Sequence, residues 1–351
     1  MSRYKHIRLK WPSISFVLDK RALLVTAILA VLLFLLMLVS TGTGEIKISP
    51  LQVLRTLFGM GTPQDALVIH TFRLPRVLVA VMVGAALAMA GAILQGVSRN
   101  PLASPDIIGI TDGAGVFVVA FIVMTTGTSS TFLSQAQWLP LAAFVGASLT
   151  ALVIMALAWK NGLPPVRLVL IGIGIAASLS AVNTMLILLA PPVLTTQAVT
   201  WKVGSVYGSN WSHVGALALW LAVLIPILAY MARSLNVQAL GDSVATSVGS
   251  RVNRQRVVLI LLSTALAGSA VAFGGGITFV GLIAPHMARR LVGSAYGALL
   301  PASGLFGALV VLVSDYIGRT AFPPHDYPAG IFTACVGAPY FIYLLYKSRN
   351  T

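Results

Sequence analysis

The residues of this chain that could do chemistry are few, and none of them is spaced for catalysis. No G-x-x-x-x-G-K-[ST] loop occurs, and the dipeptide Gly-Lys is absent altogether, so the chain cannot hold ATP through a phosphate-binding loop of its own. H-E-x-x-H and G-x-S-x-G are absent as well, which removes the spacings typical of zinc peptidases and serine hydrolases. We therefore predict that the chain is not an enzyme and that it has no cofactor.

Metal-ligating and redox-active side chains are equally sparse. The one cysteine, Cys335, lies in an apolar run, so neither a disulfide nor a cysteine metal site can form within the chain. Asp112 and Asp315 lie near the ends of apolar runs, where we expect capping or interface residues rather than a proton relay. The histidines are scattered and share no ligand spacing: His6, His70, His213, His286 and His325.

One polar segment, 233–255, has a pattern that suits contact with another protein. Asp242 is placed to cap a short helix, and Gly249 would end it. Ala245 and Val248 would give that helix an apolar face. A short helix that projects between two membrane crossings suits docking into a groove of a partner. The alternative is an amphipathic helix that lies on the membrane surface.

The composition places these residues in a membrane protein. Of 351 residues, 58% are hydrophobic and only 9% are charged, and the mean hydropathy is +0.93, whereas soluble domains are about 25% charged. A lipid-facing surface can absorb this apolar excess, and a soluble core cannot. The formal net charge is +15, but no exposed basic domain carries it. We therefore attribute the charge to the positive-inside rule and expect no nucleic acid partner.

Apolar runs separated by charged or Pro/Gly-rich breaks predict an all-α integral membrane protein with a single domain over 1–351. A cytoplasmic N-terminal segment, 1–21, precedes the first run. The eighth run is short for a full crossing, so we expect a broken or partly re-entrant helix there. The predicted spans are 22–40, 74–97, 108–126, 138–158, 167–190, 212–232, 256–275, 277–292, 299–317 and 328–346.

Charge supports a topology with both termini in the cytoplasm. If the spans alternate from a cytoplasmic N-terminus, seventeen of the 23 Lys and Arg residues lie inside, as the positive-inside rule requires. This alternation places residue 128 outside and residue 245 inside. Six basic residues are left outside, namely Lys47, Arg55, Arg73, Arg76, Lys202 and Arg319.

Two of the predicted helices carry small residues at every fourth position, which lets helices approach closely. A proline-containing break follows each stripe, at Pro101 and at Pro285. The pattern favours two related halves, helices two to five and seven to ten, in opposite orientation. The stripes are Gly84, Ala88, Ala92 and Gly96 in helix two, and Thr264, Gly268, Ala272 and Gly276 in helix seven.

A series of short motifs runs in order from about residue 45 to the C-terminus. They are Arg73-Leu-Pro-Arg76, Gly91-Ala-Ile-Leu-Gln95-Gly, Asn100-Pro-Leu-Ala103, Gly109-x-x-x-Gly113-Ala-Gly115, Trp201-x-x-Gly204, Ala239-Leu-Gly241-Asp242-x-x-Ala245, Phe279-Val-Gly-Leu-Ile-Ala-Pro285-His286 and Leu300-Pro301. Each is loose when taken singly. In this order and spacing they resemble the iron-siderophore and vitamin B12 permease family of ABC importers, the FecCD family.

The resemblance implies a vitamin B12 permease-like fold of ten helices with inverted repeats. It also implies a second permease subunit, identical or paralogous, two cytoplasmic ATPases and an extracytoplasmic substrate-binding protein as partners. ATP binding would close the ATPase pair, and coupling helices would transmit that motion to a central pathway. The family's coupling segment falls on Ala239, Leu240, Gly241, Asp242, Ala245 and Gly249.

The outward Arg73, Arg76 and Arg319 fall where relatives meet acidic residues of the binding protein. Their place on the side that disfavours positive charge independently calls for an explanation, and an acidic partner supplies one. The alternative is anchoring to lipid headgroups.

The resemblance places the translocation pathway at the subunit interface, lined mainly by helix five, with helices three and ten nearby. Candidate lining residues there are Ser178, Ser180, Asn183 and Met185, with ordinary helix packing as the alternative for each. The turn before this helix reads Gly162-Leu-Pro164-Pro165, where relatives carry small hydroxyl residues near an inner gate. We therefore carry no hydroxyl gate over to this chain.

The leading hypothesis is a permease subunit in the cytoplasmic membrane that imports ferric siderophores. Vitamin B12 or heme is the alternative cargo within the same class. A self-contained secondary transporter is the alternative from a different class, and an ATPase that co-purifies with the chain would separate the two classes.

Overall fold

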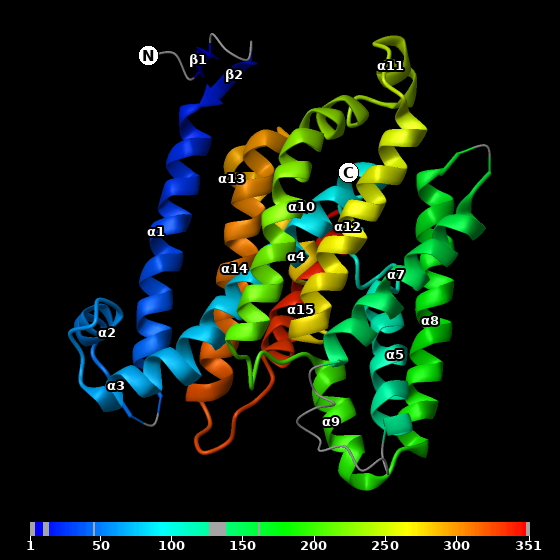
Figure 1. Cartoon of the computed structure of the whole chain (residues 1–351). Coiled ribbons are helices and arrows are strands. Elements are labelled where there is room, and N and C mark those ends of the chain that lie inside the picture. The colour runs from blue at the N-terminus through cyan, green and yellow to red at the C-terminus, as the bar shows by residue number, and fades with distance from the viewer. Residues whose placement is uncertain (1–3, 10–13, 45, 126–137, 161, 349–351) are drawn as a thin grey trace.

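The computed structural model describes residues 4–9, 14–44, 46–125, 138–160 and 162–348 and is helical apart from one hairpin (Figure 1). The strands β1 (Tyr4–Leu9) and β2 (Ile14–Asp19) pair antiparallel, with Tyr4 opposite Asp19. The hairpin lies within the predicted N-terminal segment, for which no strand was expected. Residue 128, which the charge pattern places outside, falls beyond the described residues.

The predicted spans are confirmed as ten helices. Among the described residues, eight helices are long and apolar enough to cross a membrane, and α5 is shorter. The eighth predicted span, α13, has 13 residues, or about 20 Å at 1.5 Å per residue, which is less than the hydrocarbon thickness of about 30 Å. The ten helices are α1 (Lys20–Gly42), α4 (Leu74–Ser98), α5 (Ile110–Thr125), α7 (Leu139–Ala158), α8 (Pro165–Leu189), α10 (Trp211–Gln238), α12 (Val252–Gly274), α13 (Val280–Val292), α14 (Tyr296–Thr320) and α15 (Ala329–Ser348).

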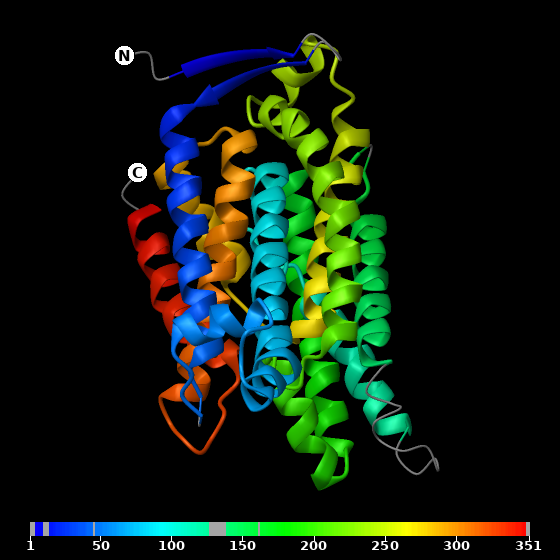
Figure 2. The ribbon, with the colours of Figure 1, turned by 60° about the vertical axis from the view of Figure 1, so that its left-hand side comes forward.

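Shorter elements lie at the two ends of the bundle (Figure 1). The connection from α1 to α4 contains α2 (Pro50–Leu57), α3 (Pro63–Leu67) and a π-helical turn, Val68–Arg73, that continues into α4. At that same end, α9 (Pro192–Val203) lies between α8 and α10. The opposite end carries α11 (Asp242–Ser247), the N-terminal hairpin and the end of α15 (Figure 2). The first and last described residues, Tyr4 and Ser348, therefore lie at the α11 end, as an even number of crossings requires.

Helix α4 forms the centre of the bundle and packs against α10, α12, α13 and α14. Its glycines allow this closeness: a Cβ at Gly91 would lie 1.8 Å from the Gly281 carbonyl oxygen, and a Cβ at Gly84 would lie 2.3 Å from that of Gly307. Gly91 lies outside the predicted small-residue stripe of this helix. Close packing along the stripe itself is confirmed at Gly84 and at Gly96, where a Cβ would lie 2.3 Å from the Tyr296 hydroxyl oxygen. The second stripe is shorter than predicted, because α12 ends at Gly274 and leaves Gly276 outside the helix.

The short α13 begins inside the bundle and depends on its neighbours for hydrogen bonds. The chain between α12 and α13 is not helical, and the N–H of Gly276 donates to the Trp201 carbonyl oxygen of α9 at 3.0 Å. The N–H of Phe279, which precedes α13, donates to Asp106 Oδ2 at 3.1 Å. Side-chain and loop groups therefore satisfy backbone donors that a continuous helix would satisfy by itself.

Candidate functional site

The predicted coupling segment forms a short helix, but a different residue begins it. The residue before α11 is Gly241, with φ +110°, and Asp242 is the first helical residue. The predicted capping role of Asp242 is therefore wrong: its carboxylate is drawn away from the helix by two arginines. Gly249 ends the helix as predicted, with φ +80°. Its N–H donates to Thr246 O at 2.9 Å, and the N–H of Ser250 donates to Ala245 O at 3.0 Å, which is the Schellman arrangement.

Asp242 joins α11 to two membrane helices. Its Oδ1 accepts hydrogen bonds from Arg99, at the end of α4, and from Arg256 Nη2 of α12 at 2.8 Å. Arg99 has φ 49°, an unusual conformation for a residue other than glycine, and its Nε donates to Gln238 O at 3.1 Å. One carboxylate therefore fixes α11 against the ends of α4, α10 and α12.

We call the contacts of Asp242 with Arg99 and Arg256 the Asp242 junction. Arg256 also connects this junction to α8, the helix that was predicted to line the pathway. Its side chain is 3% exposed, and its Nη1 donates to the Leu163 carbonyl oxygen at 2.9 Å. Leu163 lies in the turn 162–165 that leads into α8, where the sequence lacks hydroxyl residues. A buried guanidinium thus connects Asp242 to the start of α8.

The outer side of α11 is apolar and uncovered. Leu240 and Val248 are each 67% exposed, and Val244 is 45% exposed. Ala245, which was expected to share an apolar face with Val248, is fully buried against the protein itself. Burial of Ala245 and the Asp242 ion pairs hold the helix in place, and the other three apolar side chains remain free for a partner.

The opposite end of the bundle carries a second cluster of arginines and carboxylates. Asp315 of α14 is 1% exposed and lies 2.8 Å from Arg76 Nη2 and 3.8 Å from Arg319 Nε. Arg76 also holds Asp326 in a two-pronged pair, with Nη1 to Oδ2 at 2.5 Å and Nη2 to Oδ1 at 2.9 Å. Asp315 is an interface residue, as the sequence indicates, because it joins α4 to α14.

Backbone carbonyl groups take up most of the remaining arginine donors at this end. Arg73 Nη1 donates to Thr41 O and Gly42 O, each at 3.1 Å, and Nη2 donates to Ile46 O at 2.7 Å. Arg319 donates to Thr43 O at 2.7 Å and to the hydroxyl of Ser40 at 2.7 Å. Arg73 and Arg319 therefore hold the end of α1 against α4 and α14.

The three arginines predicted for binding-protein docking are thus brought together, with internal partners that the sequence reasoning missed. The docking role stays a prediction. Three arginines face two aspartates in this cluster, so the cluster keeps one net positive charge. Asp326 is 30% exposed, and Arg76 is 13% exposed, so an outside group can reach this pair.

The predicted pathway residues divide between two sides of α8. Ser178 and Met185 lie on its exposed side, and Ser180 is half-buried. Asn183 is only 1% exposed, and its Nδ2 donates to Asp112 O of α5 at 2.9 Å. Asn183 therefore packs α8 against α5 within the subunit, and Ser178 and Met185 are better placed to meet something outside it.

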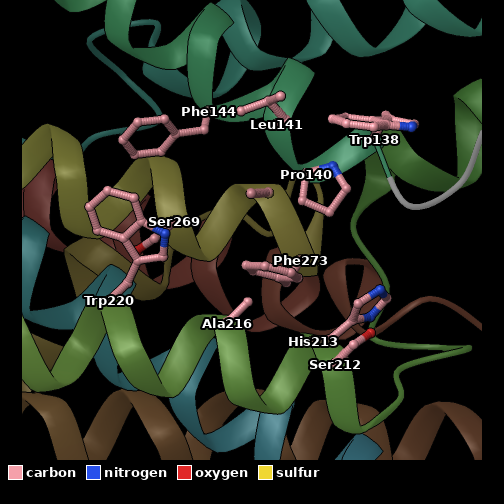
Figure 3. Close-up of a pocket in the computed structure, with 11 residues that line it drawn as sticks. Trp138, Pro140, Leu141, Phe144, Ser212, His213, Ala216, Trp220, Ser269 and Phe273 are labelled. Carbon is pink, nitrogen blue, oxygen red and sulfur yellow. The ribbon is translucent and has the colours of Figure 1, made fainter.

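A hollow of about 480 Å³ lies between α7, α10 and α12, near the end opposite α11. Figure 3 shows its wall of aromatic rings, which includes Trp138, Phe144, Trp220 and Phe273, together with His213. None of the residues predicted for the pathway lines it. The hollow is thus separate from the exposed side of α8.

Sequence reasoning missed Arg99, Arg256 and Asp326, although a signal existed. The chain has only 8 Asp and Glu residues, and a charge beside an apolar span needs a partner. Each aspartate near a predicted span should therefore have been matched with an arginine. The sequence could not show which arginine, because the partners lie far apart along the chain: 143 residues separate Arg99 from Asp242, and 250 separate Arg76 from Asp326.

The chain is similar to known permease proteins over nearly its whole length. The "Probable siderophore transport system permease protein YfhA" of Bacillus subtilis (strain 168) is 52% identical over 95% of this chain and 97% of its own length. The achromobactin transport system permease protein CbrC of Dickeya dadantii (strain 3937) is 47% identical over 92% of this chain and 91% of its own length.

A solved structure has the same fold. It is described as "An inward-facing conformation of a putative metal-chelate type ABC transporter". Its chain superposes with a TM-score of 0.81 at 31% identity, covering 92% of this chain and 99% of its own. The profile of the FecCD transport family matches residues 31–347. The protein is therefore a multi-pass membrane protein that belongs to the FecCD transport family.

Proposed function

We propose that this chain is the permease subunit of an ABC importer that carries ferric siderophores across the cytoplasmic membrane. The observation that carries this proposal is the similarity to siderophore permeases over nearly the whole chain. The absence of a phosphate-binding loop and the uncovered apolar side of α11 agree with an energy source on a separate ATPase.

Coupling to that ATPase would run through the Asp242 junction. An ATPase that grips Leu240, Val244 and Val248 moves α11, and Asp242 passes the movement to Arg256. Arg256 in turn holds the Leu163 carbonyl oxygen at the start of α8. Two cytoplasmic ATPases would serve two permease subunits, identical or paralogous, with α11 and both termini in the cytoplasm.

The second permease subunit would cover the exposed side of α8. This helix is the least buried of the long spans: 11% of its 18-residue apolar stretch is buried inside the subunit. Ser178 and Met185 would then face the pathway between the subunits, and Ser180 would lie at its edge. Asn183 would keep α8 aligned with α5.

The end opposite α11 would receive the substrate-binding protein. The net positive charge of the Arg73, Arg76 and Arg319 cluster attracts acidic side chains, and a carboxylate from the binding protein can replace Asp326 on Arg76. Charge reversal at Arg73 and Arg76 should weaken docking. Both arginines also hold the bundle together, so binding should be compared between samples that contain the same amount of folded protein. Unchanged binding of the substrate-binding protein would remove this assignment.

Uptake of labelled cargo by a deletion strain that expresses the chain with its partners tests the whole proposal. A panel of ferric siderophores, heme and vitamin B12 identifies the cargo, and we expect a ferric siderophore. Uptake that stops when the ATP site of a co-purifying ATPase is mutated would support an ABC importer. Uptake by the purified chain alone, driven by an ion gradient, would show a secondary transporter instead.

A further inference from the structure

Two basic residues at the end opposite α11 lie outside the arginine cluster described above. They are Lys47, in the chain before α2, and Arg55 of α2, and both side chains are exposed. Neither forms an ion pair with a described residue. Asp65 of α3 accepts a hydrogen bond from Gln52 Nε2 at 3.1 Å instead. Both cations are therefore available to a partner outside the chain.

Helix α2 has one side that packs against the bundle and one side that is uncovered. On the inner side, Val53 is fully buried and shares a small apolar core with Leu38 of α1. The outer side carries Leu51, Arg55 and Phe58, because residues spaced by four and then three positions share one face of a helix. Leu51 is 60% exposed, and Phe58, directly after the last residue of α2, is 76% exposed. This face therefore combines two uncovered apolar side chains with a cation.

The shared core with Leu38 fixes the depth of α2 along α1. Leu38 lies four residues before Gly42, the last residue of α1, which is about 6 Å at 1.5 Å per residue. It also lies within the predicted membrane span 22–40. Figure 1 shows α2 beside the last turns of α1 rather than beyond its end. Helix α2 is therefore level with the boundary between the apolar part of the membrane and the headgroups.

The outer side of α2 continues a surface that faces lipid. Only 22% of the apolar stretch of α1 is buried inside the subunit, and Val31 and Leu35 are each more than half exposed. The second permease subunit would cover α8, and α8 lies at the opposite edge of the bundle from α1 and α2 (Figure 1). The bilayer is therefore left to cover α1, and α2 extends that apolar surface to the headgroups.

We propose that α2 binds the phospholipid surface at this end of the bundle. Leu51 and Phe58 enter the apolar boundary of the membrane, and Lys47 and Arg55 contact headgroup phosphates. Helices with an apolar face and basic residues lie in the membrane interface in this way, and the two cations favour phospholipids with a net negative charge. The inference rests on the proposed position of the second subunit at α8 and does not depend on the cargo.

Fluorescence quenching of the full-length chain in lipid nanodiscs tests the depth of α2. A bimane label on L51C in a C335A background leaves Phe58, Lys47 and Arg55 in place. We expect strong quenching by a nitroxide on the lipid acyl chains and weak quenching by iodide in the water. H325C is the control, because His325 is exposed in the loop after α14 at the same end, and its label should show the reverse pattern.

Each other outcome of this experiment overturns the proposal in a different way. Strong iodide quenching at residue 51 would place α2 in water and leave it free for a soluble partner. Weak quenching by both reagents would show that protein covers α2, as a second copy of the chain would. Neither result bears on uptake of cargo, so failure of this inference and failure of the proposed importer can be told apart.

A second comparison tests the two cations. The nitroxide is carried either on phosphatidylglycerol or on phosphatidylcholine, and the ratio of the two quenching efficiencies at residue 51 reports local enrichment of the anionic lipid. We expect a ratio of roughly two or more, given up to about 1 kcal/mol for each basic residue near a charged membrane surface. K47Q/R55Q should bring the ratio close to that of an uncharged surface.

K20Q/R21Q is the matched control for this comparison. Lys20 and Arg21 are exposed at the α11 end, so their loss removes the same charge and should leave the ratio at residue 51 unchanged. An unchanged ratio in K47Q/R55Q, or equal falls in the two double variants, would overturn the contact of Lys47 and Arg55 with headgroups.

A third comparison tests the apolar anchor. F58S should lower quenching by the lipid nitroxide at residue 51 and raise quenching by iodide, because α2 loses its largest apolar contact with the bilayer. F58L keeps an apolar side chain and should retain most of the lipid quenching. The same quenching in F58S as in the parent protein would show that Phe58 does not hold α2 in the membrane and would overturn its assigned role.

Discussion

The two ends of this bundle use the same pair of chemical groups to opposite effect. At the α11 end, Asp242 is 48% exposed and holds a short helix whose outer side is uncovered. At the other end, Asp315 is 1% exposed and lies between Arg76 and Arg319, which also hold Asp326 and the end of α1. One cluster fixes a short helix whose apolar side is exposed. The other closes the bundle. The two clusters contain the same residue types, and they differ in how deeply the carboxylate is buried.

Removal of the buried carboxylate should have the largest effect. D315N leaves the guanidinium groups of Arg76 and Arg319 partly buried and short of a counter-charge, so we expect a loss of about 3–5 kcal/mol in the free energy of unfolding. The thermal unfolding midpoint of the purified protein in detergent measures it. The matched control is D326N, whose carboxylate is partly exposed and should cost about 1 kcal/mol or less. Equal losses in the two variants would contradict the claim that the buried carboxylate of Asp315 holds this end of the bundle together.

Substitutions at the α11 end should reduce transport more than they reduce the stability of the protein. R256Q breaks the contacts of one buried side chain with Asp242 and with Leu163 O, and we expect a loss of about 1–3 kcal/mol in unfolding free energy. Uptake per folded molecule should fall at least tenfold, while ATP hydrolysis by the complex continues. R99Q is the control, because Arg99 pairs with Asp242 without reaching the turn before α8. Tightly coupled uptake in R256Q would remove Arg256 from the coupling path.

Changes on the apolar side of α11 should alter the affinity for the ATPase and leave the stability of the fold nearly unchanged. L240S/V244S/V248S removes exposed side chains, so unfolding free energy should change by no more than about 0.5 kcal/mol. The dissociation constant for the ATPase should rise about tenfold or more, which corresponds to 1.4 kcal/mol. The hydroxyl groups of Thr246 and Ser247 donate within the helix, to Asp242 O and Ser243 O, so T246A/S247A is the matched control. Unchanged ATPase affinity in the triple serine variant would indicate that α11 lies on the membrane surface instead.

Orientation can be tested with no expected loss of function. In a C335A background, S247C at the α11 end and S212C at the opposite end place single exposed cysteines on opposite sides of the membrane. A membrane-impermeant maleimide applied to whole spheroplasts should label residue 212 and spare residue 247. The reverse pattern would exchange the roles of the two clusters.

Much of the fold could be predicted because hydropathy is a local property. Each span follows from its own run of residues, and the short α13 could be recognised from its length alone. The end of α11 at Gly249 could also be predicted, since a positive φ at a helix end favours glycine.

The contacts within each cluster could not be predicted in the same way. Asp242 has the residue type and position of a helix cap, but Arg99 and Arg256 compete for its carboxylate with full charges, and a charged hydrogen bond is stronger than a neutral one. Arg76 and Arg319 were assigned an acidic partner in another protein, whereas Asp315 and Asp326 supply internal ones. Both outcomes depend on distant parts of the chain, which composition and spacing do not reveal.

The short α13 has a consequence for how the protein is made. A helix of 13 residues is too short to enter a bilayer as a stable unit of its own. In the chain before it, the backbone N–H groups of Gly276 and Phe279 donate to Trp201 of α9 and to Asp106. During synthesis, α9 and the segment with Asp106 leave the ribosome earlier than α13. The place of α13 in the bundle therefore depends on segments that are synthesised before it.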